Sequence, residues 1–146
     1  MRFHPLLGTA LLVGCSGGAL ASTVTQTSPA APPEAFECVR RELKKVGFVQ
    51  TSYDTDELRV AARKFDASAT RPDVQFRRLV ERVEFQVSPE ADGTTRLTAK
   101  ASTFAERITH RGPTEEQEKT SDGARSAAQT VLRHCSVPVD SVRVPG

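Results

Sequence analysis

The stretch between residues 82 and 103 constrains the fold more than any other segment. Apolar and polar residues alternate in two runs, 83–87 and 97–103, and Asp92-Gly93 lies between them. A period of two predicts strands with one buried face. The Asp-Gly dipeptide is a strong signal for a β-hairpin turn. The chain is therefore expected to contain an antiparallel sheet that buries one face and exposes the other.

Two further strands and two helices are predicted around this hairpin. Residues 48–53 and 58–63 form strands joined by an acidic turn, and residues 34–46 form an amphipathic helix. Thr114 and Gln117 match a capping box that opens a second helix running toward His134, with an interruption or restart near Asp122-Gly123. Phe104 breaks the alternation, which predicts a bulge or strand end there.

The element order is α-β-β-β-β-α. We expect an α+β two-layer sandwich, with a four-stranded antiparallel sheet and two antiparallel helices on its apolar face. The folded domain is expected to span residues 34–135, followed by a C-terminal tail, 136–146.

The N-terminus has the features of a secretory signal: Arg2, then a short apolar run that ends at Val13. Leu12-Val13-Gly14-Cys15 resembles the lipobox of bacterial lipoproteins. The resemblance implies removal of residues 1–14 and acylation of Cys15, and several acyl chains on one residue anchor a protein stably. Ser16 follows the cysteine, which in that family implies the outer membrane, on its periplasmic face.

An ordinary secretory cleavage site competes with the lipobox. Ala19-Leu20-Ala21 has the small-x-small pattern, and cleavage after Ala21 would release a soluble periplasmic protein. In the lipoprotein interpretation, residues 15–33 form a flexible lipid-anchored tether, because small, polar and proline residues dominate this segment.

The two remaining cysteines test the predicted topology. Cys38 lies in the first turns of the first helix, and Cys135 ends the second. An even number of antiparallel strands between the helices brings these two ends together, so we predict a Cys38–Cys135 disulfide, which an extracytoplasmic compartment permits. The alternatives are two free thiols, or metal ligation by Cys38, His134 and Cys135, although adjacent His and Cys match no familiar zinc spacing.

Composition and motifs argue against several functional classes. The formal net charge is +2 and aromatic residues make up 5% of the chain, which favours no nucleic-acid partner. No nucleophile, phosphate-binding or zinc-protease motif occurs. His110 lies in a predicted turn, and the acidic segment 54–57 lacks the glycine and distal glutamate of a calcium loop. We therefore expect no enzyme, no cofactor and no metal.

The polar face of the sheet is the best candidate for binding. Five cations are expected to project from it: Arg59, Arg63, Arg82, Arg96 and Lys100. Such a face suits an acidic envelope protein or a phosphorylated glycolipid. The alternative is a solvated face that keeps an exposed sheet soluble. The segment 66–78 is also longer than a hairpin connection requires, and it is either a docking element or a surface loop.

Residues 35–65 are similar in style to small domains of the lipoprotein subunits of the barrel-assembly machinery of the outer membrane. The shared pattern is an amphipathic helix, a Gly-aromatic pair, a strand, an acidic turn and a strand. This resemblance implies a fold and carries no catalytic residue. We expect a non-catalytic, membrane-anchored periplasmic lipoprotein that acts as a binding or accessory module. The alternative is a soluble or tethered carrier of a small ligand or lipid.

Overall fold

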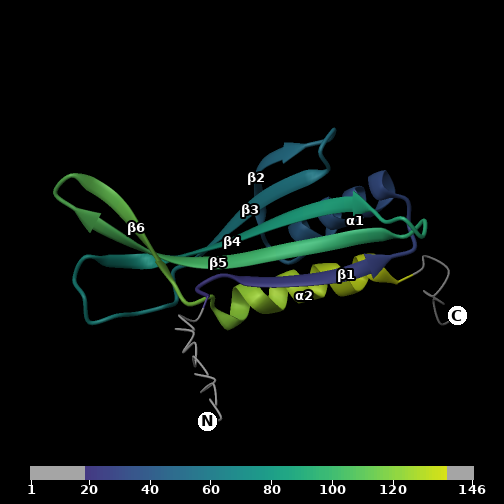
Figure 1. Ribbon diagram of the computed structural model, residues 1–146. Coiled ribbons are helices and arrows are strands. Elements are labelled where there is room, and N and C mark those ends of the chain that lie inside the picture. The colour runs from purple at the N-terminus through teal and green to yellow at the C-terminus, as the bar shows by residue number, and fades with distance from the viewer. Residues whose placement is uncertain (1–18, 138–146) are drawn as a thin grey trace, which may run out of the picture.

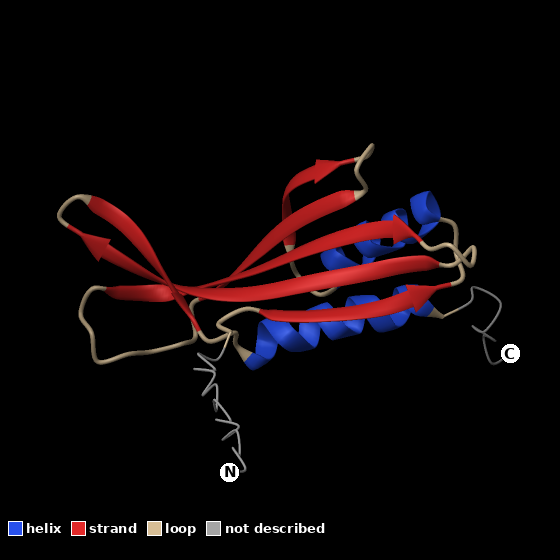
Figure 2. Ribbon diagram, viewed as in Figure 1, coloured by secondary structure: helices blue, strands red, loops and turns tan. Residues whose placement is uncertain are grey.

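The computed structural model describes residues 19–137 as one antiparallel sheet with two helices packed on the same face (Figures 1 and 2). In chain order the elements are β1 (Ser22–Ser28), α1 (Pro32–Lys45), β2 (Val49–Asp54), β3 (Arg59–Asp66), β4 (Phe76–Pro89), β5 (Thr95–Thr109), β6 (Gly112–Glu118) and α2 (Asp122–Ser136). The α+β class and the two helices are confirmed. The prediction of four strands is wrong, because the sheet has six.

The long strand β5 organises the sheet. The strand order is β1-β5-β4-β3-β2, and β6 also pairs with β5. β1 pairs with residues 95–101 and β6 with residues 103–109, so β1 and β6 lie end to end along one edge of β5. The second half of β5 projects beyond the helices together with β6 and the start of β4 (Figure 1). We call residues 76–81 and 103–118 the arm.

The core lies between the helices and the inner face of the sheet. The alternation in the central strands is confirmed. Leu58, the first residue of the predicted alternation, is half-buried, and the other side chains predicted for the inner face are buried: Val60, Ala62, Val83, Phe85, Val87, Leu97, Ala99, Ala101 and Thr103. Phe36, Val39 and Leu43 of α1 pack against them. A proline in the first helical turn has the backbone angle that a helix needs, so α1 begins at Pro32, slightly before the predicted start.

The segment assigned to a flexible tether contains a strand. Residues 22–28 form β1, so the folded unit begins well before residue 34. An edge strand needs few apolar residues, and Val24 is the one that packs on the core. Residues 1–18 and 138–146 lie outside the described part of the chain, and with them the signal peptide, Cys15 and most of the predicted tail.

The segment after Gly112 was also misassigned. Residues 112–118 form β6 instead of the first turns of a helix, and α2 begins at Asp122 with Ser121 as its N-cap. The predicted bulge at Phe104 is absent from β5, which pairs Phe104 with Val80 in regular register. β6 extends beyond the helices, so it carries no apolar alternation that marks it as a strand. Phe104 departs from the alternation because its side chain lies on the face away from the helices, opposite Val80.

The Cys38–Cys135 disulfide is confirmed, with the two Cα atoms 5.7 Å apart. The added strand β6 does not change which ends of the two helices lie together. β6 returns along the arm, and α2 continues in the same direction beneath the body of the sheet (Figure 1). The two elements together make the single return pass that the predicted long helix was expected to make.

Candidate functional site

The outer face of the sheet, which no helix covers, holds the predicted cationic residues. The strand register places Arg59 opposite Gln86, Arg63 opposite Arg82, and Lys100 opposite Glu84. These positions alternate with the buried residues of the same strands. Arg96 occupies the same face of β5 and is exposed. The structure therefore brings the five predicted side chains onto one surface.

Three of these five cations are paired with acidic residues. Arg59 lies 3.6 Å from Glu57, Arg82 forms an ion pair with Glu115, and Arg96 forms one with Glu90. Among the described residues, Arg63 and Lys100 form no ion pair. The positive charge available to a partner is therefore concentrated on these two side chains, which is less than the sequence predicts.

Aromatic side chains that sequence reasoning did not assign to this face lie next to the cations. Phe65, Val80 and Phe104 are neighbours across three strands, and Val80 is fully buried although it points away from the helices. The Arg63 guanidinium lies 5.0 Å from the centre of the Phe65 ring, and that of Arg82 lies 4.5 Å from the Phe104 ring. Stacking over a ring holds a guanidinium in place while leaving its edges free to donate hydrogen bonds.

Two shallow hollows mark the same face. One, of about 220 Å³, is lined by Arg59, Glu84, Gln86, Thr98 and Lys100. The other, of about 200 Å³, is lined in part by Arg63, Arg82 and Glu84. Glu84 lies between the hollows and separates the two unpaired cations. The hydrogen-bond donors of the arginine and lysine side chains on this face therefore surround the single carboxylate of Glu84.

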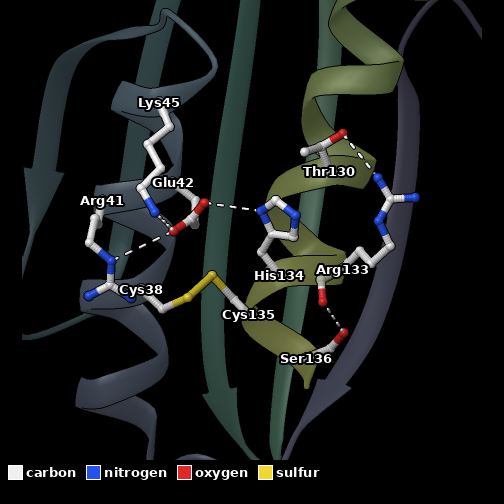
Figure 3. Close-up of polar contacts among 9 residues, drawn as sticks. All are labelled: Cys38, Arg41, Glu42, Lys45, Thr130, Arg133, His134, Cys135 and Ser136. Atoms are coloured by element: carbon white, nitrogen blue, oxygen red, sulfur yellow. Dashed lines mark hydrogen bonds and ion pairs between the residues drawn. A yellow bond between two sulfur atoms is a disulfide. The ribbon is translucent and has the colours of Figure 1, made fainter. Parts of the chain in front are cut away.

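The helical layer carries a larger groove, of about 620 Å³, between the two helices. Its walls include the disulfide, Ala35 and Glu42. Figure 3 shows Glu42 of α1 pointing toward His134 of α2, beside the sulfur bridge. The Glu42 carboxylate is 8% exposed, accepts a hydrogen bond from Lys45 Nζ at 2.8 Å, and lies 3.1 Å from His134 Nδ1.

These contacts explain the ionisation of Glu42. The hydrogen bond from Lys45 lowers the pKa of the Glu42 carboxyl against the opposing effect of burial, and His134 lowers it further. No sequence pattern singles out Glu42, because it falls within the apolar stripe of the helix. Its partners identify it as a polar bridge between the two helices.

The other titratable candidates have structural roles. Asp54 Oδ1 accepts hydrogen bonds from the backbone N–H groups of Asp56 and Glu57, both at 2.9 Å, and these bonds lower the pKa of Asp54. The acidic segment is thus a hairpin turn closed by its own first residue. His110 is exposed at the tip of the arm.

The arm is held together by charged residues. Glu106 is 7% exposed and accepts hydrogen bonds from Arg77 at 3.1 Å and from Arg78 at 3.2 Å. Arg107 pairs with Asp73 and Glu116, a contact that raises the pKa of the arginine. Ion pairs thus link all three strands of the arm with the loop that precedes β4.

Comparisons with known proteins found no relative: the sequence matches no protein-family profile and resembles no curated protein. Within residues 19–137, no helix is long and apolar enough to cross a membrane. In the same range, no group of three or more histidine, cysteine or acidic side chains is arranged to hold a metal ion.

Proposed function

We propose that this chain is a lipid-anchored, non-catalytic binding module on the periplasmic face of the bacterial outer membrane. One observation carries the binding role: both helices cover the same face of the sheet, so the face with Arg63 and Lys100 is open to a partner (Figure 2). The partner that fits it best is an anionic group rich in oxygen acceptors, such as the phosphates of a glycolipid headgroup.

The start of the fold supports processing at Cys15 over cleavage after Ala21. The backbone N–H of Thr120 donates to the Leu20 carbonyl at 3.0 Å, and the Thr120 hydroxyl lies 2.6 Å from the same oxygen. Thr120 is 4% exposed. Cleavage after Ala21 removes the Leu20 carbonyl and so takes the acceptor of the Thr120 backbone N–H, while the Thr120 hydroxyl keeps the Ala101 carbonyl at 3.1 Å. A chain that begins at Cys15 keeps this contact.

The disulfide supports an extracytoplasmic location. Structural disulfides persist in oxidising compartments and are rare in the reducing cytosol. Cys38 and Cys135 join the two helices across almost the whole described chain. The location, the anchor and the disulfide are therefore consistent with one another.

Anchoring is tested by the intact mass of the natively processed protein, measured without reduction. The expected mass begins at Cys15, includes acyl groups, and is two hydrogens lighter than the fully reduced chain. A mass that begins at Ser22 without lipid contradicts the lipoprotein assignment and favours a soluble periplasmic protein.

Binding is tested with vesicles that contain a diphosphorylated lipid A headgroup. Replacing Arg63 and Lys100 together by alanine is expected to weaken binding at least tenfold, since a hydrogen bond to a charged group contributes about 1.5–3 kcal/mol. The matched control replaces Lys44 and Arg133, two exposed cations of the helical layer, and is expected to bind normally. Equal weakening by both double variants indicates non-specific attraction, and no weakening by either directs the search to an envelope protein.

The groove between the helices favours a second candidate function, that of a carrier. Its volume of about 620 Å³ matches that of small-ligand sites, and its walls combine small apolar residues with the Glu42–His134 pair. Native mass spectrometry of the purified protein tests this candidate directly. A co-purified small molecule that is lost on filling the groove, by Phe in place of the half-buried Ala30 in its wall, supports a carrier.

A further inference from the structure

The point at which the folded chain begins limits how the domain can sit on a membrane. This inference rests on the proposed acylation of Cys15. Leu20 follows Cys15 by five positions, and a fully extended chain of five residue steps spans roughly 18 Å at most. Because Thr120 holds the Leu20 carbonyl by hydrogen bonds, the anchored lipid must lie near this part of the domain, whatever path the intervening residues take.

The root of the arm is the part of the molecule held near the lipid. β1 begins there, beside the end of β6 and the start of α2 (Figure 1). The loop formed by residues 67–75 is tied to the same place, because Arg71 forms an ion pair with Glu118, close to Thr120 in the sequence. A second ion pair, between Arg107 and Asp73 at 2.8 Å, fixes the far half of the loop to the arm.

The loop presents an apolar side chain that the fold does not use. Val74 is 99% exposed, more than any of the other large hydrophobic residues that the described structure leaves exposed. Leu20, next to the start of β1, is 47% exposed. Exposed Lys119 follows Glu118. An exposed aliphatic side chain is suited to the boundary between acyl chains and headgroups, and a long cationic one such as Lys119 reaches the phosphates.

We infer that the loop formed by residues 67–75 rests on the phospholipid surface, with Val74 inserted among the headgroups, as a second contact beside the acylated cysteine. A single lipid anchor leaves a domain free to rotate about its attachment, whereas two separated contacts fix its orientation. The side of the arm that carries this loop then faces the bilayer. β2, on which Val49 is exposed, lies at the other edge of the sheet, three strands away from β1 and the anchored N-terminus.

Single-tryptophan variants test this orientation, because the natural chain contains no Trp. Val74→Trp places the probe in the loop, and Val49→Trp is the matched control on β2, where the native valine is 68% exposed. Both acylated proteins are reconstituted into vesicles of phosphatidylethanolamine and phosphatidylglycerol whose acyl chains carry bromine. Tryptophan at position 74 is expected to show blue-shifted emission and strong quenching by the bromine. The control is expected to show solvent-like emission and little quenching.

The intact mass of each reconstituted protein shows whether Cys15 is acylated. This distinguishes a failure of the proposed orientation from a failure of the proposed function. If Cys15 is acylated and tryptophan 74 is not quenched more than tryptophan 49, the orientation is wrong while the proposed function stands. If Cys15 is not acylated, both are wrong. Since both native side chains are exposed, the substitutions are expected to leave the fold intact, which far-UV circular dichroism verifies.

Discussion

At the scale of single residues, Glu42 shows how a charged group is kept inside a helical interface. The carboxylate is almost fully buried, yet it has partners on its own helix and on the neighbouring one. Burial of a carboxylate is unfavourable unless charged hydrogen bonds compensate for it. Lys45 and His134 supply that compensation, and the lowered pKa of Glu42 reports it.

The lowered pKa predicts an acid-dependent loss of stability. A carboxyl that ionises more easily in the folded than in the unfolded chain stabilises the fold above its ordinary pKa of 4.5, and this contribution disappears as the pH falls below that value. Glu42→Gln is expected to lower the free energy of unfolding at neutral pH by about 1–3 kcal/mol and to flatten its decline in acid. Urea unfolding across this pH range measures both effects.

The control for this prediction is Glu37→Gln on the same helix. The Glu37 side chain is 62% exposed and pairs only with Arg40 among the described residues, so its replacement is expected to change stability by less than about 1 kcal/mol. Similar pH profiles for the two variants would contradict a special role of Glu42.

A second residue-scale prediction concerns the start of α2. The Ser121 hydroxyl accepts a hydrogen bond from the backbone N–H of Ala124 at 3.1 Å, and its oxygen lies 2.6 Å from Oε1 of Glu81, which is 5% exposed. Ser121→Ala removes a helix cap and leaves a buried carboxylate without this donor. We expect a loss of about 2 kcal/mol in thermal or urea unfolding. Ser126→Ala, an exposed position on the same helix, is expected to be neutral or slightly stabilising.

At the scale of elements, the sequence predicts those strands that have one buried face. β3, β4 and β5 alternate because the helices cover their inner side, and that alternation can be read directly. β1, with the sequence STVTQTS, has the composition of a linker, and β6 combines Pro113 with a helix-capping pattern. Both strands form because they pair with β5, and a pairing of this kind leaves no recognisable pattern in the strand's own sequence.

The same limit applies to the candidate site. The five cations were placed correctly because their positions follow from the strand register. Their acidic partners were not, since Glu115 belongs to the unpredicted strand β6 and Glu90 to a turn. The Glu42–His134 contact required knowledge of how the two helices pack.

The arm is expected to respond to salt differently from the body. Its strands are linked by ion pairs that are partly exposed, whereas the body is held by a buried apolar core. At about 1 M salt the screening length falls to roughly 3 Å, which weakens exposed ion pairs. Hydrogen exchange at residues 104–109 is therefore expected to accelerate with salt.

The first half of the same strand is the internal control for this measurement. Residues 95–101 of β5 lie between β1 and β4 above the helices, and their exchange is expected to change little. Equal acceleration in both halves would show that the arm is not held by its charges.

At the scale of the whole molecule, the disulfide is expected to be a large part of the stability. It joins residues separated by 97 positions. In the chain-entropy account, closing a loop of that length stabilises the fold by about 4–5 kcal/mol, against a total of about 5–15 kcal/mol for a typical domain. Replacing Cys38 and Cys135 together by alanine is expected to lower the urea midpoint accordingly. An unchanged midpoint would contradict this estimate.

The N-terminal boundary of the fold gives a further prediction. A chain that begins at Ser22 lacks the Leu20 carbonyl that Thr120 binds, whereas a chain that begins at Ala19 retains it. The shorter chain is expected to be less stable by about 1–3 kcal/mol in urea unfolding, the cost of leaving a buried donor unpaired. Equal stability of the two chains would remove this argument against cleavage after Ala21.

The pairing of β1 with β5 also limits the order in which the parts of the chain can fold. β1 is the first strand to emerge, yet its partner, residues 95–101, emerges late. Cys38 likewise waits for Cys135. Contacts between distant segments form slowly because a long loop must close first. If the chain is exported as proposed, β1 therefore has no partner until residues 95–101 arrive, and Cys38 has none until the last helix arrives. During the first of these intervals an uncharged strand is available to periplasmic chaperones.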